Sequence, residues 1–188
     1  MKKAVLYCAL VVSVMLCIGC STTTSGSGDS DARRAALNSG ADAALSNLYR
    51  QVNGSEQLVR NARGVLVFPS VVGAGLVFGA SSGEGVLRKG GRTVSFHRTT
   101  SGSWGLQAGA QSTAVFLLFM TDDALARFES SEGWAVGADA TVTLVSVGAN
   151  AQVSTDTAQQ PVIGFVLSNR GLMAGITLSG TRITRMNP

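Results

Sequence analysis

Hydrophobic and polar residues follow three successive patterns along the chain. Residues 4–18 are almost continuously apolar. Between residues 31 and 52, apolar residues recur at spacings of three and four, which predicts an amphipathic helix. From residue 65 onward, short apolar runs are separated by glycine-rich and polar stretches, a pattern typical of β-strands and turns. The sequence therefore predicts a leader, a helix and a β-rich body.

The β-rich body begins in the stretch ARGVLVFPSVVGAGLVFG at residues 62–79. Its unbroken apolar run from Val65 to Phe68 predicts a strand that is buried on both faces and that Pro69 ends. A second strand over residues 71–79 lacks side-chain volume at near-regular intervals, which lets another backbone, a bulky side chain or a ligand approach it. The glycines that create this gap are Gly73, Gly75 and Gly79.

Helix signals lie on both sides of this stretch. After the first predicted helix, Ser55 can cap a short second helix over residues 56–62. Thr121 suits the N-cap of a third helix, and the two aspartates that follow it complement the helix dipole. The first helix is expected to cover an open face or end of the sheet, and the alternative, a part in membrane binding, is implied only by the family resemblance given below.

Further strands follow at short intervals. Gly90–Gly91 predicts a tight hairpin turn between strands at 85–89 and 92–98. About eight or nine short strands, with little βαβ alternation, predict an α+β fold in which a strongly curved antiparallel sheet or a closed β-barrel is covered by two or three helices. The remaining strands are expected at 104–110 and 113–120, as one bent or two separate strands within 134–153, and as a hairpin of 162–167 with 172–179.

The apolar leader has the features of a bacterial signal peptide. Two lysines precede an apolar run that is too short to span a membrane comfortably, which predicts a secretory signal over residues 1–19. Gly19–Cys20 at its end resembles a lipobox, and this resemblance implies acylation of Cys20 rather than of Cys17, which follows a bulky leucine. Ser21 stands where an aspartate would favour the inner membrane. The expected location is therefore the periplasmic side of the outer membrane.

The remainder of the chain divides into a tether and one domain. Residues 20–30 are small and polar, which predicts a lipidated, flexible tether. Residues 31–188 are then a single globular domain. All three cysteines lie ahead of that domain, at positions 8, 17 and 20. The domain is thus expected to be held by its hydrophobic core without disulfides.

Charge is distributed unevenly along the chain. The formal net charge is +4, and loss of the two leader lysines leaves the chain weakly basic. Between residues 33 and 98 there are nine Arg or Lys residues and three acids, whereas beyond residue 98 there are four Arg and six acids. This asymmetry fits either a solvated surface or an anionic membrane or lipid partner.

The sequence argues against the common catalytic, metal and nucleic-acid sites. Residues 79–83 match G-x-S-x-G, but a hydrolase elbow needs a following helix, and here another strand follows and the single histidine, His97, lies on a predicted strand. One histidine without a cysteine in the domain cannot supply a metal cluster. The glycine pairs lack the strand-to-helix setting of a phosphate loop, and the tryptophans are not interleaved with basic residues. We expect no enzymatic activity, no cofactor or metal, and no nucleic-acid partner.

An ordered set of motifs resembles the SYLF domain family. The motifs are the stretch at residues 62–79, Gly83 and Gly85, Ser103–Trp104, and the closing GLMAGITLSG at residues 171–180. The resemblance covers residues 58–186, nearly all of the chain that follows the leader. It implies a lipid-binding domain: eukaryotic members bind phosphoinositides and some bind actin, while many bacterial members are envelope lipoproteins.

The candidate lipid contacts are cations on loops and on the first helix. Bacterial family members often carry a lysine near the positions of Ser70 and Gly73, and this chain has none there. The turn at Gly90–Gly91 is instead crowded with charges that the turn itself does not need. The predicted lipid-binding residues are Arg88, Lys89, Arg92, Arg33, Arg34, Arg60 and Arg63.

Two functional hypotheses from different classes follow. The first is a non-enzymatic outer-membrane lipoprotein whose periplasmic domain binds phospholipid, in particular anionic phospholipid. The alternative is a structural or interaction protein of the envelope that binds a protein partner, with lipid serving only as its anchor. Actin is not expected as a partner in a periplasm.

Overall fold

The computed structural model describes residues 27–75, 78–104, 111–145, 159–168, 171–172 and 178–188. The predicted signal peptide at 1–19, the lipidation site Cys20 and the tether up to residue 26 lie outside these residues. So do most of the strand expected at 104–110 and parts of the segments expected at 134–153 and 172–179.

Three helices are present in the described chain, α2 (Ser27–Gln51), α3 (Ser55–Asn61) and α4 (Asp122–Ser130). Each one confirms a helix expected from the sequence. The expected cap of α3 is wrong, because its N-cap residue is Gly54 and the Ser55 hydroxyl instead donates to the carbonyl oxygens of Val52 and Leu48. Helix α2 begins at Ser27 rather than near residue 31, so the last residues of the predicted tether are helical. Thr121 caps α4 as expected, because its Oγ1 accepts a hydrogen bond from the backbone N–H of Ala124 at 3.2 Å.

Nine strands of the described chain form one sheet. Its order is β5-β9-β3-β2-β1-β4-β7-β6, with β8 paired to β7, and the named pairs are antiparallel apart from β6 with β7. The strands are β1 (Gly64–Gly75), β2 (Phe78–Lys89), β3 (Arg92–Trp104), β4 (Gln111–Phe119), β5 (Trp134–Ala135), β6 (Thr143–Leu144), β7 (Val162–Ser168), β8 (Gly171–Leu172) and β9 (Arg182–Met186).

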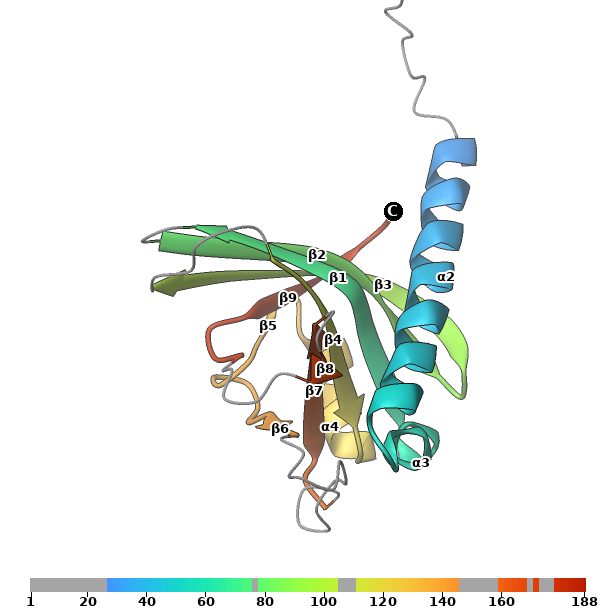
Figure 1. Cartoon of the computed structure of the whole chain (residues 1–188), viewed down its shortest axis with the longest axis vertical. Helices are drawn as coiled ribbons and strands as arrows, with labels where there is room; N and C mark the ends of the chain where they lie inside the picture. Colours follow the sequence, from blue (N-terminus) through green and yellow to red (C-terminus); the bar gives the residue numbers. More distant parts are fainter. Residues whose placement is uncertain (1–26, 76–77, 105–110, 146–158, 169–170, 173–177) are drawn as a thin grey trace, which may run out of the picture.

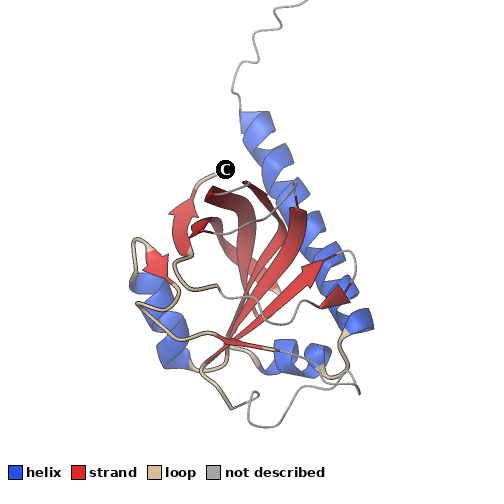
Figure 2. Cartoon of the chain, turned by 60° about the vertical axis from the view of Figure 1, so that its left-hand side comes forward, coloured by secondary structure: helices blue, strands red, loops and turns tan. Residues whose placement is uncertain are grey.

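The sheet curls strongly into a half-barrel (Figure 1). Of the two alternatives expected from the sequence, the structure therefore confirms the strongly curved sheet rather than the closed barrel. The helices lie on opposite sides of the sheet, with α2 and α3 along one face and α4 against the other (Figure 2). The strands are not uniformly short, since β1 and β2 have 12 residues each and β3 has 13.

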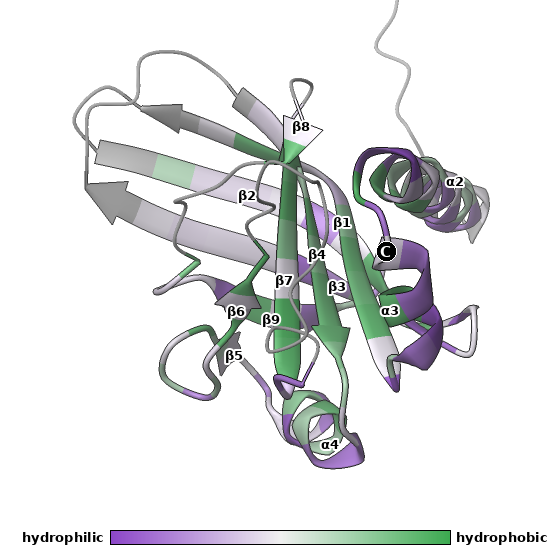
Figure 3. Ribbon diagram, turned by 60° about the horizontal axis from the view of Figure 1, so that its bottom comes forward, coloured by the Kyte–Doolittle hydropathy of each residue, from purple (hydrophilic) through white to green (hydrophobic). Residues whose placement is uncertain are grey.

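Strand β1 lies between two separate hydrophobic clusters. Val65 and Val67 pack into the cluster beneath α2 and α3, whereas Leu66 and Phe68 pack into the cluster beneath α4. Successive side chains of a strand point to opposite faces, so a continuous apolar run is what a strand between two cores requires. The prediction of a strand buried on both faces is confirmed. Hydrophobic residues also dominate the neighbouring β4 and β7, while the helices carry hydrophilic outer faces (Figure 3).

Pro69 does not end this strand, and the prediction that it does is wrong. β1 continues through it with a register shift between Val67 and Ser70 against β2. A proline lacks the N–H that a regular ladder uses, and a bulge accommodates that loss.

Two glycines on β2 leave the space that the irregular backbone of this bulge occupies. A Cβ added at Gly85 would lie 2.3 Å from the carbonyl oxygen of Val67, and one at Gly83 would lie 2.7 Å from that of Ser70. At Gly73 the nearest atom would be the Cβ of Ser81, at an ordinary 3.5 Å. The close backbone approach expected along the glycine-rich strand therefore occurs at positions 83 and 85, across from the bulge.

The hairpin between β2 and β3 has the turn expected from Gly90–Gly91. Both glycines have positive φ, 54° and 79°, as the tight hairpin turn that matches strand twist demands. Strand β9 at the end of the chain was not predicted; its Ile183 is buried between exposed Arg182 and half-buried Thr184. Within residues 134–145 the structure forms only the two short strands β5 and β6.

Candidate functional site

The two predicted lipid-binding cations of α2, Arg33 and Arg34, each have an acidic partner. Arg33 binds Glu84 on β2 through two hydrogen bonds, and Arg98 on β3 donates to the same carboxylate at 2.8 Å. Partial burial raises the pKa of Glu84, but the hydrogen bonds and charges of Arg98 and Arg33 outweigh it and hold that pKa below its usual value. These contacts join the N-terminal half of α2 to the sheet. Arg34 lies 3.7 Å from Asp31 on the same helix.

The two neighbouring cations of the hairpin point to opposite faces of the sheet. Arg88 lies under α2, where its Nη1 donates to Asp42 at 2.5 Å and its Nη2 donates to the carbonyl oxygen of Asn38 at 3.0 Å. Lys89 reaches α4 and binds Glu129 at 2.7 Å. The sequence left these two charges without a structural explanation, and the ion pairs supply one. Each one joins the hairpin to a different helix.

The other predicted cations are more exposed. Arg60 forms an exposed pair with Glu56 at 3.2 Å, and Arg63 forms one with Asp122 at 3.5 Å. Pairs of this kind contribute about 0 to 1 kcal/mol and can exchange partners easily. Arg92 is exposed and has no ion-pair partner within the described part of the chain.

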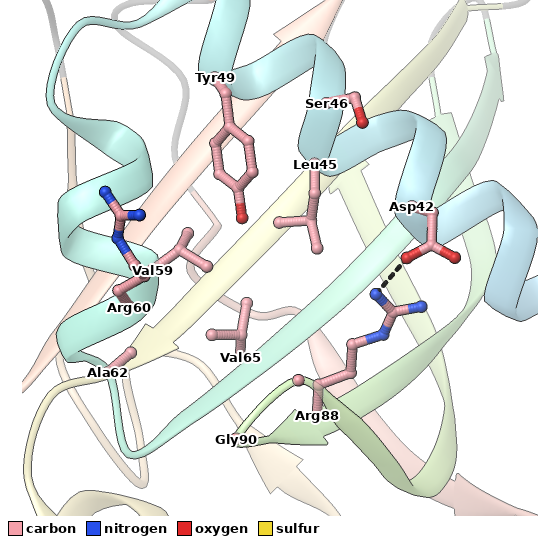
Figure 4. Close-up of a pocket in the computed structure, with 11 residues that line it drawn as sticks. Asp42, Leu45, Ser46, Tyr49, Val59, Arg60, Ala62, Val65, Arg88 and Gly90 are labelled. Atoms are coloured by element: carbon pink, nitrogen blue, oxygen red, sulfur yellow. Dashed lines mark hydrogen bonds and ion pairs between the residues drawn. The ribbon is translucent and has the colours of Figure 1, made fainter.

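A cavity of about 440 Å³ lies between α2, α3, β1 and the tip of the β2–β3 hairpin (Figure 4). This volume is within the usual range of small-molecule pockets, roughly 300 to 1,000 Å³. Most of the lining is apolar. The apolar side chains come from α2, from α3 with the residue after it, and from β1; they are Leu45, Val59, Ala62 and Val65, together with the ring of Tyr49.

Five polar residues also line the cavity: Asp42, Ser46, Tyr49, Arg60 and Arg88. The Tyr49 side chain extends between Leu45 and Val59 with its hydroxyl toward the cavity (Figure 4). Burial raises the pKa of Tyr49, as does the charge of Glu56, so the phenol stays protonated and remains a hydrogen-bond donor. Arg60 stands at the rim on α3. Arg88 forms a wall, and its Nε is buried without a hydrogen-bond partner in the described chain.

The structure thus brings together two of the predicted lipid-binding residues. Arg60 and Arg88 line one cavity, with the turn glycines that precede Arg92 at its edge. Arg33 and Arg34 lie on the upper part of α2, and the other two cations, Lys89 and Arg63, pair with residues of α4.

Sequence reasoning missed the apolar lining. Tyr49 was a possible signal, because it follows Leu45 by one helical turn and is a polar-tipped residue beside the apolar stripe of α2. Val59 and Ala62 gave no such signal, because small apolar residues are ordinary at any packed helix.

The remaining candidate motifs have ordinary structural settings. The G-x-S-x-G sequence lies inside β2, where Ser81 hydrogen-bonds Ser101 across the strands at 2.5 Å, and His97 pairs with Gly85 further along. This is not the strand-to-helix turn that a nucleophile elbow needs. Among the described residues there is no group of three potential metal ligands. The same residues contain no helix long and apolar enough to cross a bilayer.

Comparison with known proteins gives a match over the C-terminal part of the chain. The model of the SYLF, or Ysc84, family, described as "Las17-binding protein actin regulator", matches residues 100–187. These residues include β4, α4, β7 and β9, while α2, α3 and both cavity cations lie ahead of them. No curated protein matches the chain.

Proposed function

We propose that this chain, a member of the SYLF domain family by the match over residues 100–187, is a non-enzymatic outer-membrane lipoprotein. We further propose that its periplasmic domain binds phospholipid, because domains of this family are associated with lipid and actin binding. The proposal has two parts, an anchor and a binding surface. Each part has its own support and its own test.

The anchor is proposed at Cys20. A charged start, a short apolar run and Gly19–Cys20 form a leader that ends as lipoprotein leaders end. Ser21 in the next position supports the outer membrane rather than the inner one. A single acyl chain binds a membrane only marginally, so the several chains of a mature lipoprotein would be needed for stable anchoring.

Replacing Cys20 by alanine is expected to abolish lipid attachment. The thiol is the group that receives the diacylglyceryl chain, and alanine offers no nucleophile in its place. Metabolic labelling with radioactive palmitate measures this directly. Cys17→Ala serves as the matched control and should retain the label, whereas label on the Cys20 variant would place the anchor elsewhere.

The observation that supports the proposed binding surface is the cavity between α2, α3 and the hairpin. It combines an apolar lining with a cation at its rim, Arg60, and a second exposed cation beside its edge, Arg92. A phospholipid surface offers the complementary chemistry, since it presents phosphates over hydrocarbon. The weak pair of Arg60 with Glu56 leaves that guanidinium available to a phosphate.

Replacing both Arg60 and Arg92 by serine is expected to weaken binding to phosphatidylglycerol vesicles by about 30-fold at low salt. The estimate follows from about 1 kcal/mol for each cation near an anionic surface. Flotation of the chain starting at Ser21, which retains every described residue and lacks the acyl anchor, measures the binding. High salt should weaken the wild-type protein in the same way, because it screens exposed charges.

A second double variant that also removes two positive charges distinguishes binding at this surface from general attraction between the protein's net charge and the vesicle. Arg127→Ser with Arg185→Ser removes two exposed cations on the side of α4 and β9, and should leave vesicle binding nearly unchanged. Equal losses in both double variants would assign the binding to net charge. Failure of the wild-type protein to bind any phospholipid vesicle would overturn the proposal and favour a protein partner in the envelope.

Actin is not proposed as the partner. The family model takes its description from Las17 binding and actin regulation, and those properties belong to the proteins that carry that name. A lipoprotein on the periplasmic side of an outer membrane would not encounter actin.

A further inference from the structure

We infer that the cavity between α2, α3 and the β2–β3 hairpin holds the acyl chain of a single-chain anionic amphiphile, a fatty acid or a lysophospholipid, with the head group bound at Arg88. The inference rests on the proposed lipid function and specifies a ligand for it. That ligand is a single lipid molecule bound inside the cavity, not the surface of a bilayer.

The shape of the lining fits one hydrocarbon chain. Leu45 on α2, Val59 on α3 and Val65 on β1 contribute apolar side chains from three elements, so a chain between them would be enclosed on three sides (Figure 4). Apolar surface buried in this way is the main favourable contribution to binding a hydrocarbon. The volume of about 440 Å³ lies toward the lower end of ligand pockets, which favours one chain over the two of a phospholipid.

Arg88 provides a positive charge that the fold holds in place. Its side chain is only 12% exposed, and Asp42 and the Asn38 carbonyl accept hydrogen bonds from its two terminal nitrogens. Its Nε remains buried with no acceptor in the described chain. A buried donor without an acceptor is unfavourable, and an anionic oxygen is the acceptor that satisfies it best; because this Nε has almost no accessible surface in the structure, the side chain must turn toward the cavity to meet that oxygen. A wholly apolar ligand would leave this donor unsatisfied.

Asp42 acts in this arrangement as a competing internal anion. Its carboxylate occupies Arg88 Nη1 but is itself 67% exposed, so the pair is not sealed from solvent. An incoming carboxylate or phosphate must share or displace this contact. Removing the charge of Asp42 should therefore strengthen ligand binding, a result that a merely structural role for the Asp42–Arg88 pair would not produce.

The experiment uses the chain starting at Ser21 and dodecanoate below its aggregation concentration, with titration calorimetry as the measurement. We expect saturable binding of one dodecanoate per chain, and also of a lysophosphatidylglycerol at monomeric concentrations. Dodecyl maltoside has the same chain with a neutral head, and acetate has the head without the chain. Both should bind at least about tenfold more weakly.

Two variants with matched controls locate the site. Ser46 is an exposed residue of α2 that lines the cavity, so Ser46→Trp should obstruct it and weaken dodecanoate binding by at least about tenfold, whereas Ala35→Trp on the exposed part of the same helix should not. Asp42→Asn should tighten binding by about three- to tenfold, and Asp31→Asn, which breaks the other acidic pair of α2, should not. Thermal unfolding of each variant checks that the fold is retained.

The outcomes distinguish this inference from the function on which it rests. Vesicle flotation without saturable dodecanoate binding overturns the inference and leaves the surface function standing. Dodecanoate binding without flotation supports the cavity and overturns the vesicle surface. Equal affinity for dodecyl maltoside would refute the anionic head, and unchanged binding in Ser46→Trp would place the ligand outside this cavity.

Discussion

Replacing Phe116 by alanine is expected to lower the free energy of unfolding by about 3 to 5 kcal/mol, the usual cost of removing a buried aromatic side chain. Phe116 is fully buried on β4 at 0% exposure, in the cluster beneath α2 and α3. It pairs with Val67 of β1 on one side and with Phe165 of β7 on the other. A cavity at this central position cannot be closed by a small shift of one neighbour, because the paired neighbours belong to two different strands.

Urea unfolding followed by circular dichroism measures this loss. Phe68→Ala probes the opposite cluster, beneath α4, and should cost a similar amount. Val94→Ala is the control, because Val94 is a large apolar residue of the same sheet that is exposed. A Phe116 variant whose stability stays within about 0.5 kcal/mol of wild type would show that β4 is not a core strand.

Stability is expected to fall as the pH is lowered from 7 to 4, with a loss on the order of 3 kcal/mol from His97 alone. His97 is 6% exposed and packs on the ring of Phe128 at a centroid distance of 5.0 Å. Burial, and after it the charge of Arg185, lower its pKa from 6.5 to about 4, while Glu129 acts in the opposite direction. The unfolded chain therefore binds a proton near pH 6.5, well before the folded protein does. The stability present above that pH is lost progressively as the pH falls toward 4.

The variant His97→Leu should remove most of this pH dependence. Its free energy of unfolding, measured by urea denaturation at pH 7.0, 6.0 and 5.0, should change much less than that of wild type. This window lies above the usual pKa of carboxyl groups, so the acid-sensitive Glu84 cluster adds little to the difference. Equal slopes for the two proteins between pH 7 and 5 would rule out His97 as the source.

Local signals in the sequence predicted the elements that local chemistry determines. Thr121 as a helix cap, the Gly90–Gly91 turn and the doubly buried run from Val65 to Phe68 all depend on a few neighbouring residues, and each is present. The bulge at Pro69 was not predictable in this way, because it depends on the absence of side chains at Gly83 and Gly85 on the paired strand. Strand β9 is stabilised by β3, a partner more than 80 residues earlier in the chain.

The candidate site shows the same division. The sequence identified the cations but treated Arg88 and Lys89 as one basic turn, and strand alternation sends them to opposite faces. The acid with which each cation pairs depends on how the helices pack against the sheet, and the sequence of the hairpin does not reveal it. The apolar cavity was likewise hidden, because its lining comes from residues 45, 59 and 65, which the fold assembles from three elements.

The length of α2 sets the distance between the N-terminus of that helix and the cavity. The helix starts at Ser27, beyond the edge of the sheet, and the cavity lies near its other end, beside Tyr49 (Figures 1 and 4). At about 1.5 Å per residue, these two points are about 33 Å apart, close to the thickness of the hydrocarbon core of a bilayer. Helix α2 therefore keeps its own N-terminus and the pocket about one bilayer core apart. Adding or removing turns ahead of Arg33 would change this separation without altering any residue that lines the pocket.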